Sequence, residues 1–158
     1  MMPAPLTDLW GTALLAGLVG TGAWLDWRER RLPNWLCGIT FLAGVAVTVI
    51  TAGVAALPAH GWHAGLALLA GMALFAPGLI GGGDAKFYAA VAVWFPLGDG
   101  FRLLFAAALA GQVLILALWG LVWRRQRVAG GLTPASPQPR TVPFGVAIAA
   151  GALALQIW

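Results

Sequence analysis

Two aspartates, Asp26 and Asp84, are the residues of this sequence best suited to chemistry. The chain has only five acidic residues in 158, and Asp84 separates two long apolar stretches. An unpaired carboxylate at membrane depth costs about 2.5–3.5 kcal/mol on insertion scales, so an acid in such a place predicts a functional site. The alternative interpretation of Asp84 is structural, as an aspartate in a turn that caps the helix after it.

A pair of carboxylates in one site has a defined chemistry, the hydrolysis of a peptide bond. Two close carboxylates cannot both ionise cheaply, so one activates a water as general base while the other donates a proton to the carbonyl oxygen. This reaction uses no metal or other cofactor. The two histidines, His60 and His63, stand three residues apart in a predicted loop with no third ligand in reach. We therefore expect no metal site.

A string of three glycines, Gly81 to Gly83, comes directly before Asp84. Glycine carries no side chain, so this string weakens a helix locally and lets another backbone approach closely. We predict a break in a membrane segment at this point, open to an extended substrate backbone.

The composition is that of an integral membrane protein. Hydrophobic residues make up 61% of the chain and charged residues 9%, whereas about a quarter of the residues of soluble domains are charged. A span needs about 20 apolar residues, which leaves room for six spans and no separate soluble domain. We predict an all-α, polytopic membrane helix bundle of about six transmembrane helices, forming one domain over residues 1–158. The apolar runs are 9–24, 34–57, 64–80, 84–95, 101–123 and 142–158.

The basic residues predict how the bundle is oriented. With the amino terminus outside, only Arg102 of the nine Lys and Arg residues lies outside, as the positive-inside rule prefers. Most basic residues then lie at span ends beside lipid headgroups, so we expect no nucleic-acid partner. In this topology Asp26 ends the first span and Asp84 opens the fourth. Both acids reach the cytoplasmic face, which makes a shared site possible.

Three motifs of the sequence resemble those of the type IV prepilin peptidases. Gly81-Gly82-Gly83-Asp84 matches the G-x-G-D motif of the family's second aspartate, and the match continues to Lys86. Asp26, followed by basic residues and Leu32-Pro33-Asn34, is similar to the first aspartate motif. Residues 143–147 resemble the P-Y/F-G-x-A signature that opens the last helix. The resemblance covers nearly the whole chain and is closest in size to the short members that serve tight-adherence (Flp) pili.

The resemblance implies a membrane aspartic endopeptidase with Asp26 and Asp84 as its catalytic pair. Its substrates would be prepilins or pseudopilins with a basic leader and an apolar helix, cleaved at the cytoplasmic face of the bacterial inner membrane. Larger members also bind zinc through paired cysteines and methylate the new amino terminus, which we do not expect of a chain whose one cysteine is Cys37. The residues that would bind substrate or support the pair are Gly81, Gly83, Lys86, Arg28, Pro33, Asn34, Pro143 and Gly145.

A small proton-coupled transporter or channel is the alternative from another class of protein. Broken helices and buried acids also build ion pathways. Two observations disfavour it, because the sequence shows no internal repeat and both acids are predicted at one face instead of mid-membrane. A non-catalytic assembly partner with a peptidase scaffold is a further alternative. Such a protein is expected to lack one of the two aspartates, and both are present here.

Overall fold

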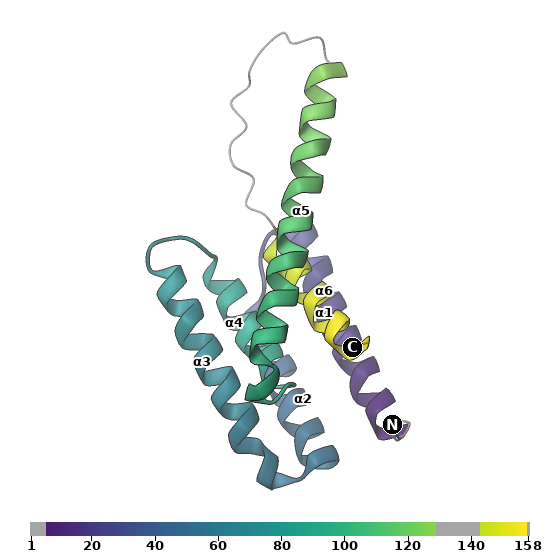
Figure 1. The fold of residues 1–158 in the computed structure, drawn as a ribbon, viewed down its shortest axis with the longest axis vertical. Helices are drawn as coiled ribbons and strands as arrows, with labels where there is room; N and C mark the ends of the chain where they lie inside the picture. Colours follow the sequence, from purple (N-terminus) through teal and green to yellow (C-terminus); the bar gives the residue numbers. More distant parts are fainter. Residues whose placement is uncertain (1–5, 129–142, 158) are drawn as a thin grey trace.

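The computed structural model describes residues 6–128 and 143–157, and within these residues it contains helices and no strands (Figure 1). The predicted all-α bundle is confirmed. Its six α-helices are α1 (Leu6–Glu29), α2 (Asn34–Ala52), α3 (Leu57–Phe75), α4 (Gly82–Ala92), α5 (Gly100–Val128) and α6 (Phe144–Ile157). Short 3-10 helices precede α3 (Val54–Ala56) and α5 (Leu97–Asp99). By length and composition, α2 and the segment 97–121 are each able to cross a membrane.

The connection between α2 and α3 differs from the prediction. The second apolar run was expected to continue to residue 57, but α2 ends at Ala52, where Gly53 takes a φ of 80°. Glycine adopts this conformation without steric cost, so it ends the helix. α3 then begins at Leu57 with Pro58 in its first turn, where the missing backbone N–H of proline costs no hydrogen bond.

The two histidines therefore lie on α3, and their prediction as loop residues is wrong. His60 Nδ1 donates to the carbonyl oxygen of Val93 at 2.8 Å, and His63 Nδ1 donates to that of Phe95 at 2.9 Å. Both acceptors follow the end of α4, where carbonyls lack partners within the helix. The histidines thus satisfy the carboxyl end of a short internal helix.

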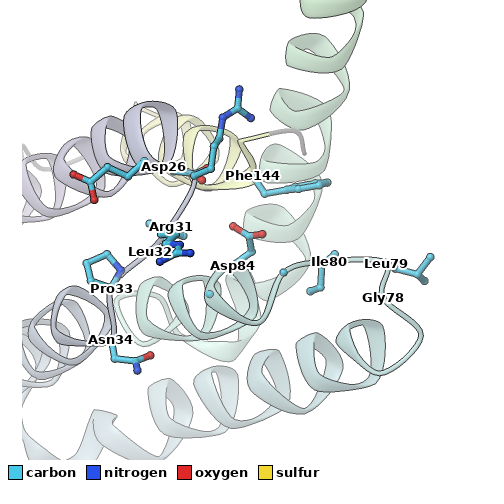
Figure 2. Close-up of a pocket in the computed structure, with 14 residues that line it drawn as sticks. Asp26, Arg31, Leu32, Pro33, Asn34, Gly78, Leu79, Ile80, Asp84 and Phe144 are labelled. Carbon is cyan, nitrogen blue, oxygen red and sulfur yellow. The ribbon is translucent and has the colours of Figure 1, made fainter. Parts of the chain in front are cut away.

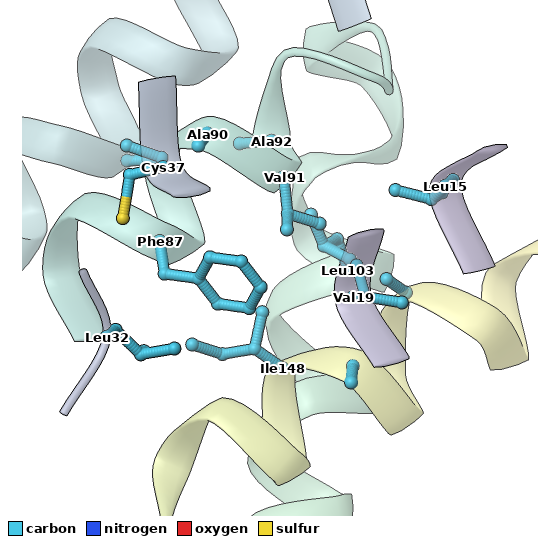
Figure 3. Packing of buried hydrophobic residues seen from close by; sticks show 14 of the residues in the cluster. Leu15, Val19, Leu32, Cys37, Phe87, Ala90, Val91, Ala92, Leu103 and Ile148 are labelled. Carbon is cyan, nitrogen blue, oxygen red and sulfur yellow. The ribbon is translucent and has the colours of Figure 1, made fainter. Parts of the chain in front are cut away.

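α4 and α6 are the inner helices of the bundle. α4 packs against α2, α3 and α6, and α6 packs against α1, α4 and α5. α4 has only 11 residues, about 16 Å of helix, which is short for a span. Phe87 of α4 is fully buried in the core, beside Val19 from α1 and Ile148 from α6 (Figure 3).

Small residues let these helices approach one another, and large apolar residues cover the outside. Gly71 of α3 lies against Ala85 of α4, and Gly151 of α6 lies against the backbone of α5 at Ala107. Close contacts at small residues are the usual way in which membrane helices pack. Many large apolar side chains point outward, among them Trp10 and Trp119, which are 79% and 70% exposed. Such a surface suits lipid.

Replacing Gly151 should separate α5 from α6. A Cβ at this position would stand 2.6 Å from the Ala107 Cα, so we expect Gly151→Ala to lower the free energy of unfolding by about 1–3 kcal/mol. Reversible unfolding in detergent measures this change. The control is Gly20→Ala in α1, where nothing lies within 4 Å and alanine should stabilise the helix slightly. Equal stability of the two variants would contradict the described packing.

Candidate active site

A cleft of about 790 Å³ opens at the end of the bundle where α1 ends and α4 and α6 begin. One wall comes from Asp26 and residues 29–34, and the other comes from residues 78–81 with Gly83 and Asp84. Phe144, the first residue of α6, completes the lining. Asp26 from α1 and Asp84 from α4 both line this cleft, and Figure 2 labels the two residues there. The structure thus brings together two acids that lie on different helices.

Asp26 is held by the amino end of α6. Its side chain is 6% exposed, and one of its carboxylate oxygens accepts a 2.7 Å hydrogen bond from the backbone N–H of Gly145, 119 residues away. The first N–H groups of a helix have no partner within it and carry partial positive charge, so they stabilise an anion. Gly145 also leaves room for the Asp26 carboxylate, because the Cβ atom of any other residue at this position would stand 2.9 Å from the same oxygen.

Asp84 lies in the first turn of α4, directly after the glycine string. A Cβ on Gly81 would stand 2.7 Å from its carboxylate oxygen, so any other residue at this position would displace the Asp84 carboxyl group. Gly83 packs on Leu32 from the opposite wall, with a Cβ position 3.4 Å from that side chain. The glycines therefore make space for the acid and bring the two walls of the cleft close together.

The two acids affect each other electrostatically. The negative charge of Asp26 acts on Asp84, and both carboxyl groups are partly removed from solvent. Burial and a neighbouring negative charge both favour the protonated form of a carboxyl group, so this arrangement is suited to holding one acid protonated while the other is ionised. Such a pair combines a proton acceptor with a proton donor. No cluster of three or more His, Cys, Asp or Glu side chains suited to a metal occurs in residues 6–128 and 143–157.

α1 ends beside the cleft in an unusual turn at Arg30. The Arg30 N–H bonds the carbonyl of Asp26 at 3.0 Å, and its φ is 54°. A left-handed conformation costs a non-glycine residue about 1–2 kcal/mol. The turn leads into Pro33, which is extended and followed by the first residue of α2. Residues 31–33 consequently form an extended edge of the cleft.

Most of the residues predicted to bind substrate or support the pair lie at the cleft. Gly81, Gly83, Pro33 and Asn34 line it. Gly145 holds Asp26 through its backbone. Pro143 is fully buried directly before α6, where its carbonyl accepts from the N–H of Val146 at 3.2 Å. This proline helps to start the helix whose amino end binds Asp26.

Arg28 and Lys86 are not part of the cleft lining. The Arg28 guanidinium lies over the ring of Trp24, 5.8 Å from its centroid. Lys86 Nζ donates to Asn34 Oδ1 at 3.1 Å, which connects α4 to the start of α2. Lys86 links the walls that carry Asp84 and Asn34.

Sequence reasoning missed several residues of the cleft. Arg30 lies four residues after Asp26, and helical spacing alone would have placed the two on one face. Leu79 and Ile80, which line the wall before the glycine string, gave no signal, because they continue an apolar run of the sequence. Phe144 was included in a motif and not assigned a role.

These features define the class of protein as an all-helical membrane bundle with two acids in one terminal cleft. The model of the type IV leader peptidase family matches residues 13–116, more than half of the chain and including both acids, so the chain belongs to that family. No curated protein and no solved structure gives a significant match. The protein is accordingly a membrane peptidase of prepilin leaders.

Replacing Gly145 should disturb the acid that it holds. In Gly145→Ala the new Cβ meets the Asp26 side chain at 2.9 Å, and a displaced catalytic group typically costs about a hundredfold in rate. We expect a loss of this size in kcat/KM for prepilin cleavage, measured alongside the unfolding temperature. Gly38→Ala, on an open face of α2, should keep full activity. Undiminished cleavage by Gly145→Ala would show that the function of Asp26 does not depend on a glycine at position 145.

Proposed function

We propose that this protein is an aspartic endopeptidase that removes the basic leader of Flp-like type IV prepilins at the cytoplasmic membrane face. Asp26 and Asp84 are its catalytic residues, within a single membrane domain. The observation that carries the proposal is that both acids line one cleft although they come from α1 and α4. A purely structural Asp84, acting as a helix cap, gives no reason for a second acid in the same cleft.

The pair would hydrolyse the peptide bond with one bound water. The ionised carboxylate takes a proton from this water, and the resulting hydroxide adds to the scissile carbonyl carbon. The protonated carboxyl gives its proton to the carbonyl oxygen, which yields a tetrahedral diol. The first carboxyl group, now protonated, then gives its proton to the amide nitrogen, the second carboxylate takes a proton from one hydroxyl of the diol, and the C–N bond breaks. The products are the leader with a new carboxylate and the mature chain with a new amine.

The shape of the cleft supports an extended peptide as substrate. Pro33 has φ −71° and ψ 143°, and Gly81 has φ −73° and ψ 144°, so both walls present extended backbone. Glycines at 78, 81 and 83 lack side chains that would obstruct this space. A peptide lying between the walls would pass both carboxyl groups.

The distribution of charge supports the cytoplasmic face. Arg28, Arg30 and Arg31 lie at the end of α1 and Lys86 near the start of α4, at the same end of the bundle as the cleft (Figure 1). Arg102 lies at the start of α5, at the opposite end, where it pairs with Asp99 at 3.4 Å. The positive-inside rule therefore favours a cleft that faces the cytoplasm of a multi-pass inner-membrane protein. Arg140, which we counted on the same side, lies outside the described residues.

The catalytic pair can be tested by amide substitutions. We expect Asp26→Asn and Asp84→Asn each to lower prepilin cleavage by about a thousandfold or more, and the double variant to be little worse, because members of a catalytic unit are strongly non-additive. The cleavage rate of the wild-type protein should have a bell-shaped dependence on pH, and its two limbs should report the pair as a unit and not either residue alone. The assay is cleavage of a Flp-like prepilin by purified protein in detergent.

Asp99→Asn is the matched control, because this acid lies at the far end of the bundle. It should cleave at the wild-type rate. Appreciable turnover by a well-folded Asp84→Asn protein would refute the proposed mechanism.

The orientation can be tested with single cysteines in a Cys37→Ser background. Leu79 is 66% exposed on a wall of the cleft, and Gly98 is exposed at the opposite end of the bundle. In intact cells a membrane-impermeant maleimide should label Gly98→Cys and leave Leu79→Cys unlabelled until the cells are lysed. The reverse pattern would place the cleft outside the cell.

A further inference from the structure

Arg30 is the one non-glycine residue with positive φ among the described residues, at 54°. Residues with long side chains avoid this region, and a helix end that requires it usually has glycine there. Residues in this conformation cluster at functional sites, so an arginine here raises the question of what its side chain does that glycine would not. The only such residue lies in the wall of the active-site cleft.

Arg30 contributes a positive charge to the cleft that Asp26 also lines. The backbone N–H of Arg30 bonds the Asp26 carbonyl at 3.0 Å, so the left-handed turn fixes one residue relative to the other. The guanidinium lies over the ring of Trp27, 6.0 Å from its centroid, which restrains it. Its charge acts on the Asp26 carboxylate, and both residues line the cleft.

The charges around the two acids are unequal. The charged side chains of the cleft are those of Asp26, Glu29, Arg30, Arg31 and Asp84. The described residues of α6 bring no charged side chain and supply the backbone N–H of Gly145. Each acid has a backbone N–H donor, from Gly145 for Asp26 and from Gly81 for Asp84. The two acids therefore differ in the charges that act on them: the Arg30 cation acts on Asp26, and the negative charge of Asp26 acts on Asp84.

We infer that Arg30 is a positioning residue that keeps Asp26 as the ionised, proton-accepting member of the pair and leaves Asp84 to donate the proton. The inference rests on the proposed function of the pair. It accounts for the strained turn, because glycine would satisfy the backbone but would remove the cation. It also assigns different roles to two acids that the reaction alone leaves interchangeable.

The test is Arg30→Gly, assayed for kcat/KM of prepilin cleavage across pH. Glycine suits a φ of 54°, so the variant should unfold at the wild-type temperature or above. Without the cation, Asp26 needs a higher pH to ionise. The acid limb of the profile should therefore move up by about one pH unit, a small shift for loss of a neighbouring opposite charge. Activity on that limb should fall about tenfold.

Two further variants separate charge from structure. Arg30→Lys keeps the positive charge, so the acid limb of its pH profile should coincide with that of the wild type, although lysine also has an unfavourable φ at this position. Arg28→Gln removes a neighbouring arginine that also stacks on a tryptophan but lies outside the cleft, and its limb should not move.

Three results would overturn the inference: a wild-type pH profile for Arg30→Gly, an equal shift for Arg28→Gln, or a lower unfolding temperature for Arg30→Gly, which would indicate a structural role. If Asp26→Asn is inactive but the acid limb of Arg30→Gly stays at the wild-type pH, only the role of Arg30 is rejected. An active Asp26→Asn would reject the catalytic pair itself.

Discussion

The hydrogen bond from the Gly145 N–H to the Asp26 carboxylate is the contact on which the rest of the site depends. It joins the end of α1 to the start of α6 at 2.7 Å, and α6 in turn packs on α4, which carries Asp84. A buried carboxylate without such a partner is costly, so this bond also stabilises the fold around it. One interaction thereby fixes the position of an acid and the relative position of three helices.

The sequence predicted the helical class, the two acids and part of the cleft lining, because these leave local signals. A carboxylate in an apolar stretch, a glycine string and a proline at a helix start each have one main physical explanation. Hydrophobic runs also gave the number of helices, since each helix in a membrane needs an apolar surface of its own.

The parts that the sequence did not predict depend on contacts between distant segments. His60 and His63 looked like loop residues because a proline and a glycine flank them, yet carbonyls after α4 accept hydrogen bonds from both. Lys86 was expected to bind substrate or support the pair, but its side chain donates a hydrogen bond to Asn34 at the start of α2. The left-handed φ of Arg30 has no signal in the sequence, since arginine is not a residue that favours it.

The histidine bonds at the end of α4 have a consequence for how the enzyme responds to its lipid. A helix of 11 residues covers about half of a bilayer core, and such an end is tolerated in hydrocarbon only where protein satisfies its carbonyls. Because α4 is surrounded by other helices, hydrophobic mismatch acts on the outer helices, which adapt by tilting. We therefore expect the position of Asp84 to depend on packing within the protein more than on the thickness of the membrane.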